Sequence, residues 1–340
     1  MKYAGVLTAA AAALVAGCAS AGSQGPMPLP VANAVRTVPN AGVRRSWMLP
    51  QAKGSSTILI YAADEAVGAV DVYDYGSGTQ VGSIGILATG GCVDAAGDVY
   101  FSDSGDGTLV EYAHGGTKPL KRYHPGGELG GCSIDADGDI AVTGGSPGRV
   151  IIYPKGDAKK GTTYSDGYCD FDAEAMGYDG KGDVVGEGMY DDISVCGVLA
   201  GAKQETTLAT KGITIGFPNG VMWDGKHLAV GDQEAGSGKN DTGLYEATVS
   251  GTTVVARKEV LLTDSCYRGL TDVLDPFVLG KKNTPVNTQQ GRVVVGSNAY
   301  CFSGSGGGGI EYWHYPAGGN PYKMYTTADP ITVLTVSIGT

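Results

Sequence analysis

The sequence predicts an all-β protein made of repeated units, and three observations support this prediction. First, a tract of the form D-x-x-G-D followed by an apolar run recurs, in one case slightly shortened, at 90–103, 130–144, 175–188 and 217–232. Second, the intervals between the aspartates that open these tracts are 41, 44 and 45 residues, counted along Asp94, Asp135, Asp179 and Asp224. Third, segments of alternating apolar and polar residues, such as VDVYDY at 70–75 and TLVEYA at 108–113, recur along the chain. A period of about 40–50 residues that carries short strands is typical of a β-propeller.

Each repeat is expected to form one blade of four antiparallel strands. In the second repeat the predicted strands, from the channel to the rim, are Cys92–Ala95, Val99–Ser102, Thr108–Ala113 and Leu120–Tyr123. The D-x-x-G-D segment predicts the first hairpin, because glycine tolerates positive φ and aspartate caps the turn. Residues 103–107 (DSGDG) predict the second hairpin. They lack the later Glu and the spacing of an EF-hand, so a turn is favoured over a calcium loop.

The two ends of the repeat region predict how the ring closes. TILIYAAD at 57–64 matches a second strand, so its inner strand is missing on the N-terminal side. DPITVLTVS at 329–337 resembles an isolated inner strand. We therefore expect a six-bladed β-propeller, closed by the C-terminal strand joining the N-terminal blade, with no open sheet edge. Residues 264–290 and 304–309 are expected to be extra loops. Nineteen Tyr against five Phe fits stacked sheets in which a ring is buried and its hydroxyl reaches water.

The N-terminal segment predicts export and lipid attachment. Residues 4–16 are apolar but shorter than the ~20 residues that span a bilayer. Small residues end the stretch, as in a secretory signal peptide, and Val15-Ala16-Gly17-Cys18 resembles a bacterial lipobox. We expect residues 1–18 to be a lipoprotein signal peptide, with Cys18 carrying lipid such as palmitate. Cleavage near Ala19 or Ala21, which would give a secreted protein, is the alternative. Because Ala19 follows the cysteine where an inner-membrane protein would have Asp, the outer membrane is the expected location.

Composition narrows the remaining choices. Residues 19–54 are rich in Ala, Gly, Pro and Ser without hydrophobic periodicity, and predict a flexible tether before a propeller at 55–340. The net charge of −11 argues against nucleic acid as a partner. We expect a monomer that contacts the membrane through its lipid and a protein or glycan through its loops. The histidines fall in strand ends, hairpins or rim loops, which favours structural or exposed positions for His114, His124, His227 and His314.

Six cysteines besides Cys18 predict up to three disulfides in an exported protein. Cys92 and Cys132 both follow Gly-Gly at the start of consecutive blades, so they are expected to be spatial neighbours. Cys169 with Cys196, and Cys266 with Cys301, would each close one blade that has a long inserted loop. A thiolate metal site is the alternative, but no Cys-x-x-Cys pair is present.

Polar residues at the ends of second strands form the candidate ligand site. Their equivalent positions place them near one end of the channel, and they comprise Asp64, Asp103, Glu187, Asp232 and Asn298. Converging carboxylates repel unless a cation or water separates them, so a cation or polar-ligand site is one hypothesis. The other is that each aspartate caps its own hairpin. We expect no cofactor, with a divalent cation such as calcium as the alternative.

With these residues in view, the chain resembles the NHL/SMP-30-like superfamily of six-bladed propellers, through GCVDAAGDVYFSDSGDGTLVEY at 91–112. It is similar to a group of bacterial exported propellers that carry PxGVxWDGKxLAVGDQ and YPAGGxP phrases, here at 218–233 and 315–321. The resemblance covers roughly residues 55–340 and is specific for the fold.

The enzyme branch of this superfamily, lactonases and related esterases, holds one divalent metal through a Glu, two Asn and an Asp. The resemblance implies that Asn219, in the phrase Pro-Asn-Gly, is one such ligand. Residues 267–270 (YRGL) stand where the family has an Asp-Gly phrase, and 331–336 contain no Glu. We therefore expect a lipid-anchored cell-envelope propeller that acts as a binding or scaffolding module and not as an enzyme. The alternative is a metal-dependent lactonase or esterase.

Overall fold

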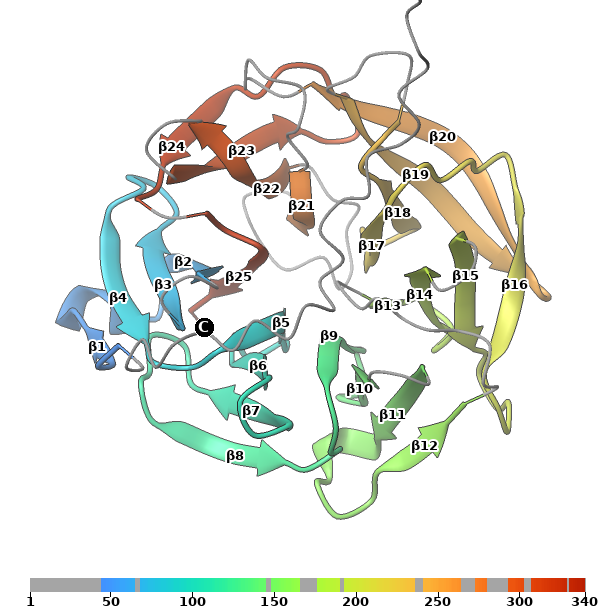
Figure 1. Ribbon diagram of the computed structural model, residues 1–340, viewed down its shortest axis with the longest axis horizontal. Helices are drawn as coiled ribbons and strands as arrows, with labels where there is room; N and C mark the ends of the chain where they lie inside the picture. The colour runs from blue at the N-terminus through green and yellow to red at the C-terminus, as the bar shows by residue number, and fades with distance from the viewer. Residues whose placement is uncertain are drawn as a thin grey trace, which may run out of the picture. The chain divides into compact units, whose positions relative to one another are not determined.

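The strands are arranged as six antiparallel blades around a common centre (Figure 1). The computed structural model describes residues 44–64, 68–144, 148–165, 176–189, 193–235, 241–263, 273–279, 293–302, 307–328 and 330–339. In these ranges the helical elements are two short 3₁₀ turns, η1 (Pro50–Lys53) and η2 (Pro154–Gly156). No helix in the described ranges is long and apolar enough to cross a membrane. The prediction of an all-β, six-bladed propeller is confirmed.

Blade 1 combines both ends of the described chain. Its strands are β25 (Val333–Ile338), β2 (Ile58–Asp64), β3 (Ala69–Asp74), β4 (Gln80–Ile84) and β1 (Trp47–Met48). β25 is the inner strand and pairs antiparallel with β2, from Ile58 opposite Ile338 to Ala63 opposite Val333. This confirms that the C-terminal strand closes the ring. β1 pairs with β4, so residues 47–48, inside the segment predicted as a tether, form the outer edge of this blade.

Blades 2 and 3 are regular four-stranded meanders. Blade 2 contains β5 (Ala88–Val93), β6 (Val99–Asp103), β7 (Thr108–Tyr112) and β8 (Pro119–Tyr123). Blade 3 contains β9 (Leu129–Ile134), β10 (Ile140–Gly144), β11 (Arg149–Tyr153) and β12 (Thr162–Tyr164). In each blade the strands pair in chain order from the centre to the rim. The strands predicted for the second repeat are thus confirmed, with the inner strand starting four residues earlier than expected.

Blades 4 and 5 are joined at the rim. Blade 4 contains β13 (Met176–Tyr178), β14 (Val184–Met189), β15 (Ile193–Val198) and β16 (Thr206–Lys211). Blade 5 contains β17 (Pro218–Trp223), β18 (Leu228–Asp232), β19 (Asp241–Ser250) and β20 (Thr253–Thr263). The two rim strands pair parallel, from Ala209 opposite Thr253 to Lys211 opposite Val255, so the two blades share one eight-stranded sheet. Blade 6 contains β21 (Val273–Leu279), β22 (Val293–Phe302), β23 (Gly307–His314) and β24 (Lys323–Thr326).

The repeated aspartate has the same structural role in four blades. Asp94 Oδ1 accepts hydrogen bonds from the N–H groups of Ala96 and Asp98, both at 2.9 Å. The equivalent carboxylates of Asp135, Asp179 and Asp224 each accept two N–H groups of their own turns in the same way. Gly97 in the first of these turns has φ of 90°, which a side chain would strain. The prediction that D-x-x-G-D forms the first hairpin of a blade is therefore confirmed.

Aromatic rings fill the spaces between blades. Tyr61 of blade 1 packs against Phe101 of blade 2 with ring centroids 5.8 Å apart, and Tyr75 meets Tyr312 of blade 6 edge-on at 5.0 Å. Their hydroxyls bond the backbone where we expected them to reach water: Tyr61 Oη accepts the Gly115 N–H at 2.8 Å, and Tyr312 Oη donates to the Tyr75 carbonyl at 3.0 Å. A buried hydroxyl needs such a partner because desolvation without one is unfavourable.

A disulfide between Cys92 and Cys132 links the inner strands of blades 2 and 3. The S–S distance is 2.00 Å and the Cα–Cα distance is 5.5 Å. This confirms the pairing expected from the Gly-Gly-Cys repeat. Cys196 also takes part in a disulfide. Cys169, Cys266 and the side chain of Cys301 lie outside the described residues, so the other two pairings stay predictions.

Candidate functional site

The ends of the second strands occupy equivalent positions, as the candidate site requires. Asp103 pairs with Ala88 at the start of β5, and Asp232 pairs with Pro218 at the start of β17. Asn298 pairs with Val273 at the start of β21, and Asp64 ends β2. Their backbones therefore lie at the same end of their blades. The side chains of Asp64 and Asn298 lie outside the described residues.

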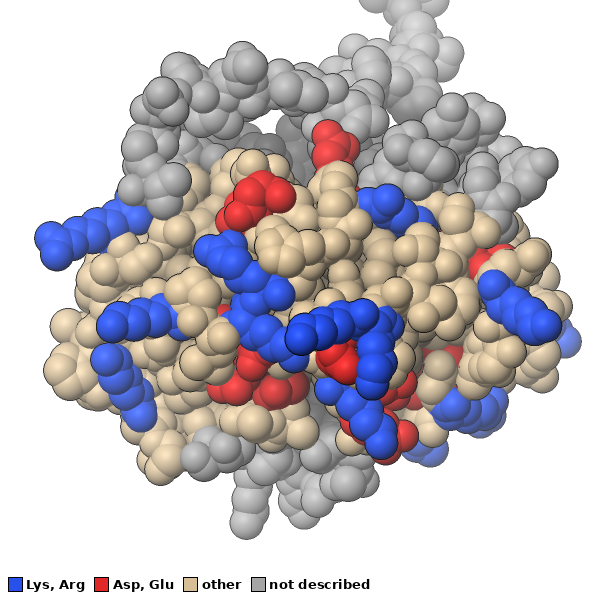
Figure 2. Space-filling model, turned by 90° about the horizontal axis from the view of Figure 1, so that it is seen from below, with Lys and Arg blue, Asp and Glu red and all other residues tan. Residues whose placement is uncertain are grey.

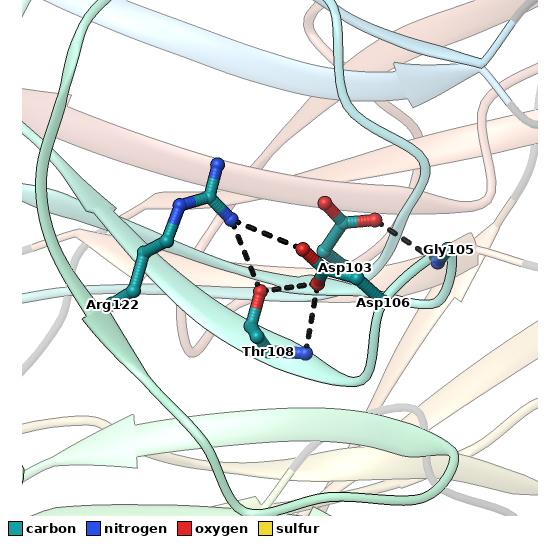
Figure 3. Close-up of polar contacts among 5 residues, drawn as sticks. All are labelled: Asp103, Gly105, Asp106, Thr108 and Arg122. Atoms are coloured by element: carbon teal, nitrogen blue, oxygen red, sulfur yellow. Dashed lines mark hydrogen bonds and ion pairs between the residues drawn. The ribbon is translucent and has the colours of Figure 1, made fainter.

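Asp103 belongs to the polar network of its own hairpin (Figure 3). Its Oδ1 accepts the N–H of Gly105 at 3.0 Å. Asp106 Oδ1 accepts the N–H of Thr108 at 3.1 Å, and Arg122 Nη1 lies 3.3 Å from Asp106 Oδ2. Burial raises the pKa of the Asp103 carboxyl above its usual range, opposed by the Gly105 hydrogen bond. Residues 103–107 thus form the predicted hairpin, and the Asp103 carboxylate stabilises its turn.

Asp232 holds the loop that leads into blade 5. Its carboxylate is buried, and Oδ1 accepts three backbone N–H groups, from Gly216, Phe217 and Glu234, each at 3.0 Å. All three N–H donors meet at one oxygen of the carboxylate and fix its position. The contact of Asp103 matches the hairpin-capping hypothesis, whereas Asp232 bonds mainly to the loop between blades 4 and 5.

Glu187 and Asn219 are the two candidates that the structure brings into contact. Glu187, in the second strand of blade 4, and Asn219, in the inner strand of blade 5, are both buried. Glu187 Oε2 accepts the backbone N–H of Asn219 at 3.1 Å. The Asn219 Cβ and carbonyl pack directly against Gly231, where an added Cβ would meet them at 2.8 Å. This carboxylate–amide pair therefore lies in a tightly packed contact between blades 4 and 5.

A second polar cluster, which the sequence analysis missed, lies in blade 5 at the other end of the strands. It contains Asp224 and His227, from the β17–β18 turn, and Glu246 of β19, all buried. His227 Nδ1 lies 3.6 Å from Asp224 Oδ2 and 3.8 Å from Glu246 Oε1. Tyr315, which follows β23 in blade 6, donates its hydroxyl to Asp224 Oδ2 at 2.9 Å. Carboxylate, imidazole and phenol groups thus meet between two blades.

The sequence did hold one indication of this cluster. The fourth repeat reads D-G-K-H where the other three read D-x-x-G-D, so His227 stands where Asp98, Asp139 and Asp183 stand elsewhere. In the sequence this difference shows as a fourth repeat with a shorter turn segment. The approach of Glu246 and Tyr315 could not be inferred, because it depends on strand register and on the neighbouring blade.

Comparisons with known proteins support the β-propeller fold. No protein-family model matches the chain, and no curated protein matches it. Among solved structures, a chain from the crystal structure of a nidogen/laminin complex is similar, with a TM-score of 0.58 and 14% sequence identity. The alignment covers 83% of this chain and 99% of that chain. At this level of identity the likeness establishes a shared β-propeller fold.

Proposed function

We propose that this protein is a lipid-anchored propeller of the bacterial cell envelope that binds an acidic polysaccharide through the rim of blades 2 and 3. The observation that carries the proposal is a group of exposed cations there. We call this group the basic rim; it consists of Lys118, Lys121, Arg122, Lys155, Lys159 and Lys160. Lys and Arg side chains gather along the middle of this side of the molecule, with Asp and Glu side chains beside and below them (Figure 2).

Contacts between the two blades hold the basic rim together. Lys121 Nζ and Tyr123 Oη of β8 both donate to the carbonyl of Gly156, which follows Lys155 in blade 3. The ion pairs with acidic groups are Arg122 with Asp106 at 3.3 Å and Lys160 with Asp157 at 3.1 Å. Glu111 lies near Lys121, and Asp139 accepts the Lys155 N–H, so the six cations of the rim face four acidic groups and leave a small local excess of positive charge on a protein of net charge −11. Such a local excess favours an anionic partner.

A shallow pocket lies beside the basic rim. It has a volume of about 190 Å³ and is lined by residues that include His124, Tyr153, Lys159 and Thr163. An aromatic edge, a hydroxyl and a cation are the groups that a carboxylated sugar ring can contact through its face, its hydroxyls and its charge. Because the pocket is open, it suits an extended polymer better than an enclosed small molecule.

Binding of polygalacturonate to the full chain, purified in detergent, tests the partner class. We expect binding that weakens as salt rises, and a roughly tenfold loss of affinity in the triple variant Lys121→Glu/Lys155→Glu/Lys159→Glu, since each exposed charge pair contributes about 0.2–1 kcal/mol. The matched control, Lys203→Glu/Lys211→Glu on the exposed rim of blade 4, should bind as the wild type does. Equal loss in both variants, or no binding to the polysaccharide, would contradict the proposal.

Lipid attachment is tested separately through Cys18. In cells fed labelled palmitate, the wild-type protein should carry label and fractionate with the outer membrane, whereas Cys18→Ser should carry none. An unlabelled wild-type protein in the soluble fraction would favour cleavage near Ala19 or Ala21.

A second candidate function, a metal-dependent lactonase or esterase, is favoured by the contact between Glu187 and Asn219. Both are buried, and Asn219 lies in the Pro-Asn-Gly phrase that supplies a metal ligand in the resembling enzymes. If the protein is such an enzyme, it should hydrolyse a lactone or an ester, and both EDTA and the Asn219→Ala substitution should abolish that activity. Hydrolysis unaffected by EDTA, or none on a panel of lactones and esters, would exclude it.

A further inference from the structure

We propose that Asp224, His227 and Glu246 form a binding site for one zinc ion between blades 5 and 6. The site lies at the end of the strands opposite Asp232, because Asp232 pairs with the first residue of β17 and Asp224 follows the last. It is therefore separate from the candidate residues at the second-strand ends and from the Glu187–Asn219 contact.

His227 supplies the observation that points to a ligand. Its side chain is 7% exposed, and Nδ1 is buried without a hydrogen-bond partner. A buried ring nitrogen without a partner loses its hydration and gains nothing in return. With the ring proton on Nε2, the Nδ1 lone pair faces the two carboxylates and is available to a metal.

The distances suit a metal better than a proton. A protonated Nδ1 would need an acceptor at about 2.7–3.2 Å, and both carboxylate oxygens lie beyond this, at 3.6 and 3.8 Å. In a tetrahedral zinc site with bonds of about 2.0–2.1 Å, neighbouring ligand atoms stand roughly 3.4 Å apart. A zinc ion therefore needs each carboxylate oxygen to move a few tenths of an ångström toward Nδ1, and the two oxygens to approach each other by at most roughly 1.4 Å. The three ligand atoms all lie within 4.8 Å of one another.

The charges and the ligand types also favour zinc. Two buried carboxylates at close range repel unless a cation lies between them. Asp224 is fully buried and accepts hydrogen bonds from neutral donors, namely two backbone N–H groups and the Tyr315 hydroxyl. One nitrogen and two oxygens are a donor set that zinc accepts, whereas calcium and magnesium prefer oxygen alone. Tyr315 would then orient Asp224 Oδ2 from outside the ligand set.

Blade 2 shows what the same positions do without a histidine. There Glu111 corresponds to Glu246 by register. Two tyrosine hydroxyls donate to the blade 2 carboxylates at these positions. Tyr123 donates to Glu111 Oε2 at 3.3 Å, and Tyr100 donates to Asp94 Oδ2 at 3.4 Å.

In blade 5 the positions of these two tyrosines are Ala229 and Val260, and His227 replaces Asp98. The phenol donor to the aspartate comes instead from Tyr315 of blade 6, and the position of Tyr123 holds an apolar residue. The added imidazole nitrogen is therefore the main difference between the two clusters, and it supplies the ligand type that zinc prefers.

Zinc binding to the full chain, purified in detergent and stripped with EDTA, tests the proposal. We expect about one tightly bound Zn²⁺ per chain by calorimetry and elemental mass spectrometry, and a higher melting temperature with zinc. His227→Gln and Glu246→Gln should each weaken binding at least about tenfold. Glu111→Gln, the matched position in blade 2, should leave binding unchanged. Asn219→Ala is measured beside it to report on the Glu187–Asn219 contact.

X-ray absorption spectroscopy at the zinc edge, on the wild-type protein, keeps the proposal testable if a variant fails to fold. It should show one imidazole nitrogen and oxygen ligands without sulfur. A chain that binds no zinc, zinc affinity that survives His227→Gln, or equal loss in Glu111→Gln would overturn the assignment. Loss in Asn219→Ala alone would move the metal to the hydrolase site instead.

Discussion

The disulfide between blades 2 and 3 allows a quantitative prediction. Replacing both Cys92 and Cys132 with alanine opens a loop whose ends are 40 residues apart in sequence. In the chain-entropy model, closing a loop of that size in the unfolded chain stabilises the fold by roughly 4 kcal/mol. Because a domain has a total stability of about 5–15 kcal/mol, this bond would supply a large share. We therefore expect the double variant to remain folded but to unfold at much lower urea concentration.

Urea unfolding followed by tryptophan fluorescence measures this loss. Each single variant, Cys92→Ala or Cys132→Ala, breaks the same bond, so each should lose nearly as much as the double variant. The slope of unfolding free energy against urea should rise, because the unfolded chain without the crosslink exposes more surface. A double-variant loss below about 1 kcal/mol, or single losses that add up, would refute the reasoning.

Three further predictions concern ring closure, pH and packing. A chain ending at Thr332 lacks β25 and leaves β2 without its inner partner. Its cooperative thermal unfolding, followed by circular dichroism, should therefore disappear. A melting curve like that of the wild type would contradict ring closure by β25. Burial lowers the pKa of His114 below its usual 6.5, so the unfolded state binds the proton more readily and stability should fall as pH drops below about 6.5. Urea midpoints should show this decline in the wild type and a flatter profile in His114→Gln. Gly90→Ala places a Cβ 2.3 Å from the Gly130 carbonyl oxygen and should lower the free energy of unfolding in urea by about 1–3 kcal/mol. Gly54→Ala, whose nearest contact is 3.4 Å, is the control and should lose less. Equal losses in the two variants would refute the clash.

The sequence predicted what local chemistry determines. Alternation in TLVEYA and the turn chemistry of D-x-x-G-D set strands and hairpins, and the structure confirms both. The Cys92–Cys132 bond followed from two equivalent positions in adjacent repeats. The matching of 57–64 to a second strand predicted the closure by β25.

Long-range register decides the features that sequence reasoning missed. The pairing of β16 with β20 depends on how the rims of two blades approach, and no pattern within either strand encodes it. β1 contains two residues, too few for a periodic pattern. The cluster around His227 needs Glu246 to face Ala229 across β18–β19 and Tyr315 to arrive from the next blade. For the hairpin carboxylates, the repeat favoured capping, and the contact of Asp103 matches it, but the bonds from Asp232 to the loop before β17 were not predicted.

The closure of the ring by β25 also sets the order of events in folding. Ile58 pairs with Ile338, so one edge of β2 has no partner until almost the whole of this sequence has been made. The hairpins of blades 2 to 5 pair neighbouring segments and can form earlier. Closing the ring must then be a late and slow step, because it joins residues far apart along the chain. Until that step an unpaired strand edge is exposed, and we expect the chain to need protection from aggregation for that period.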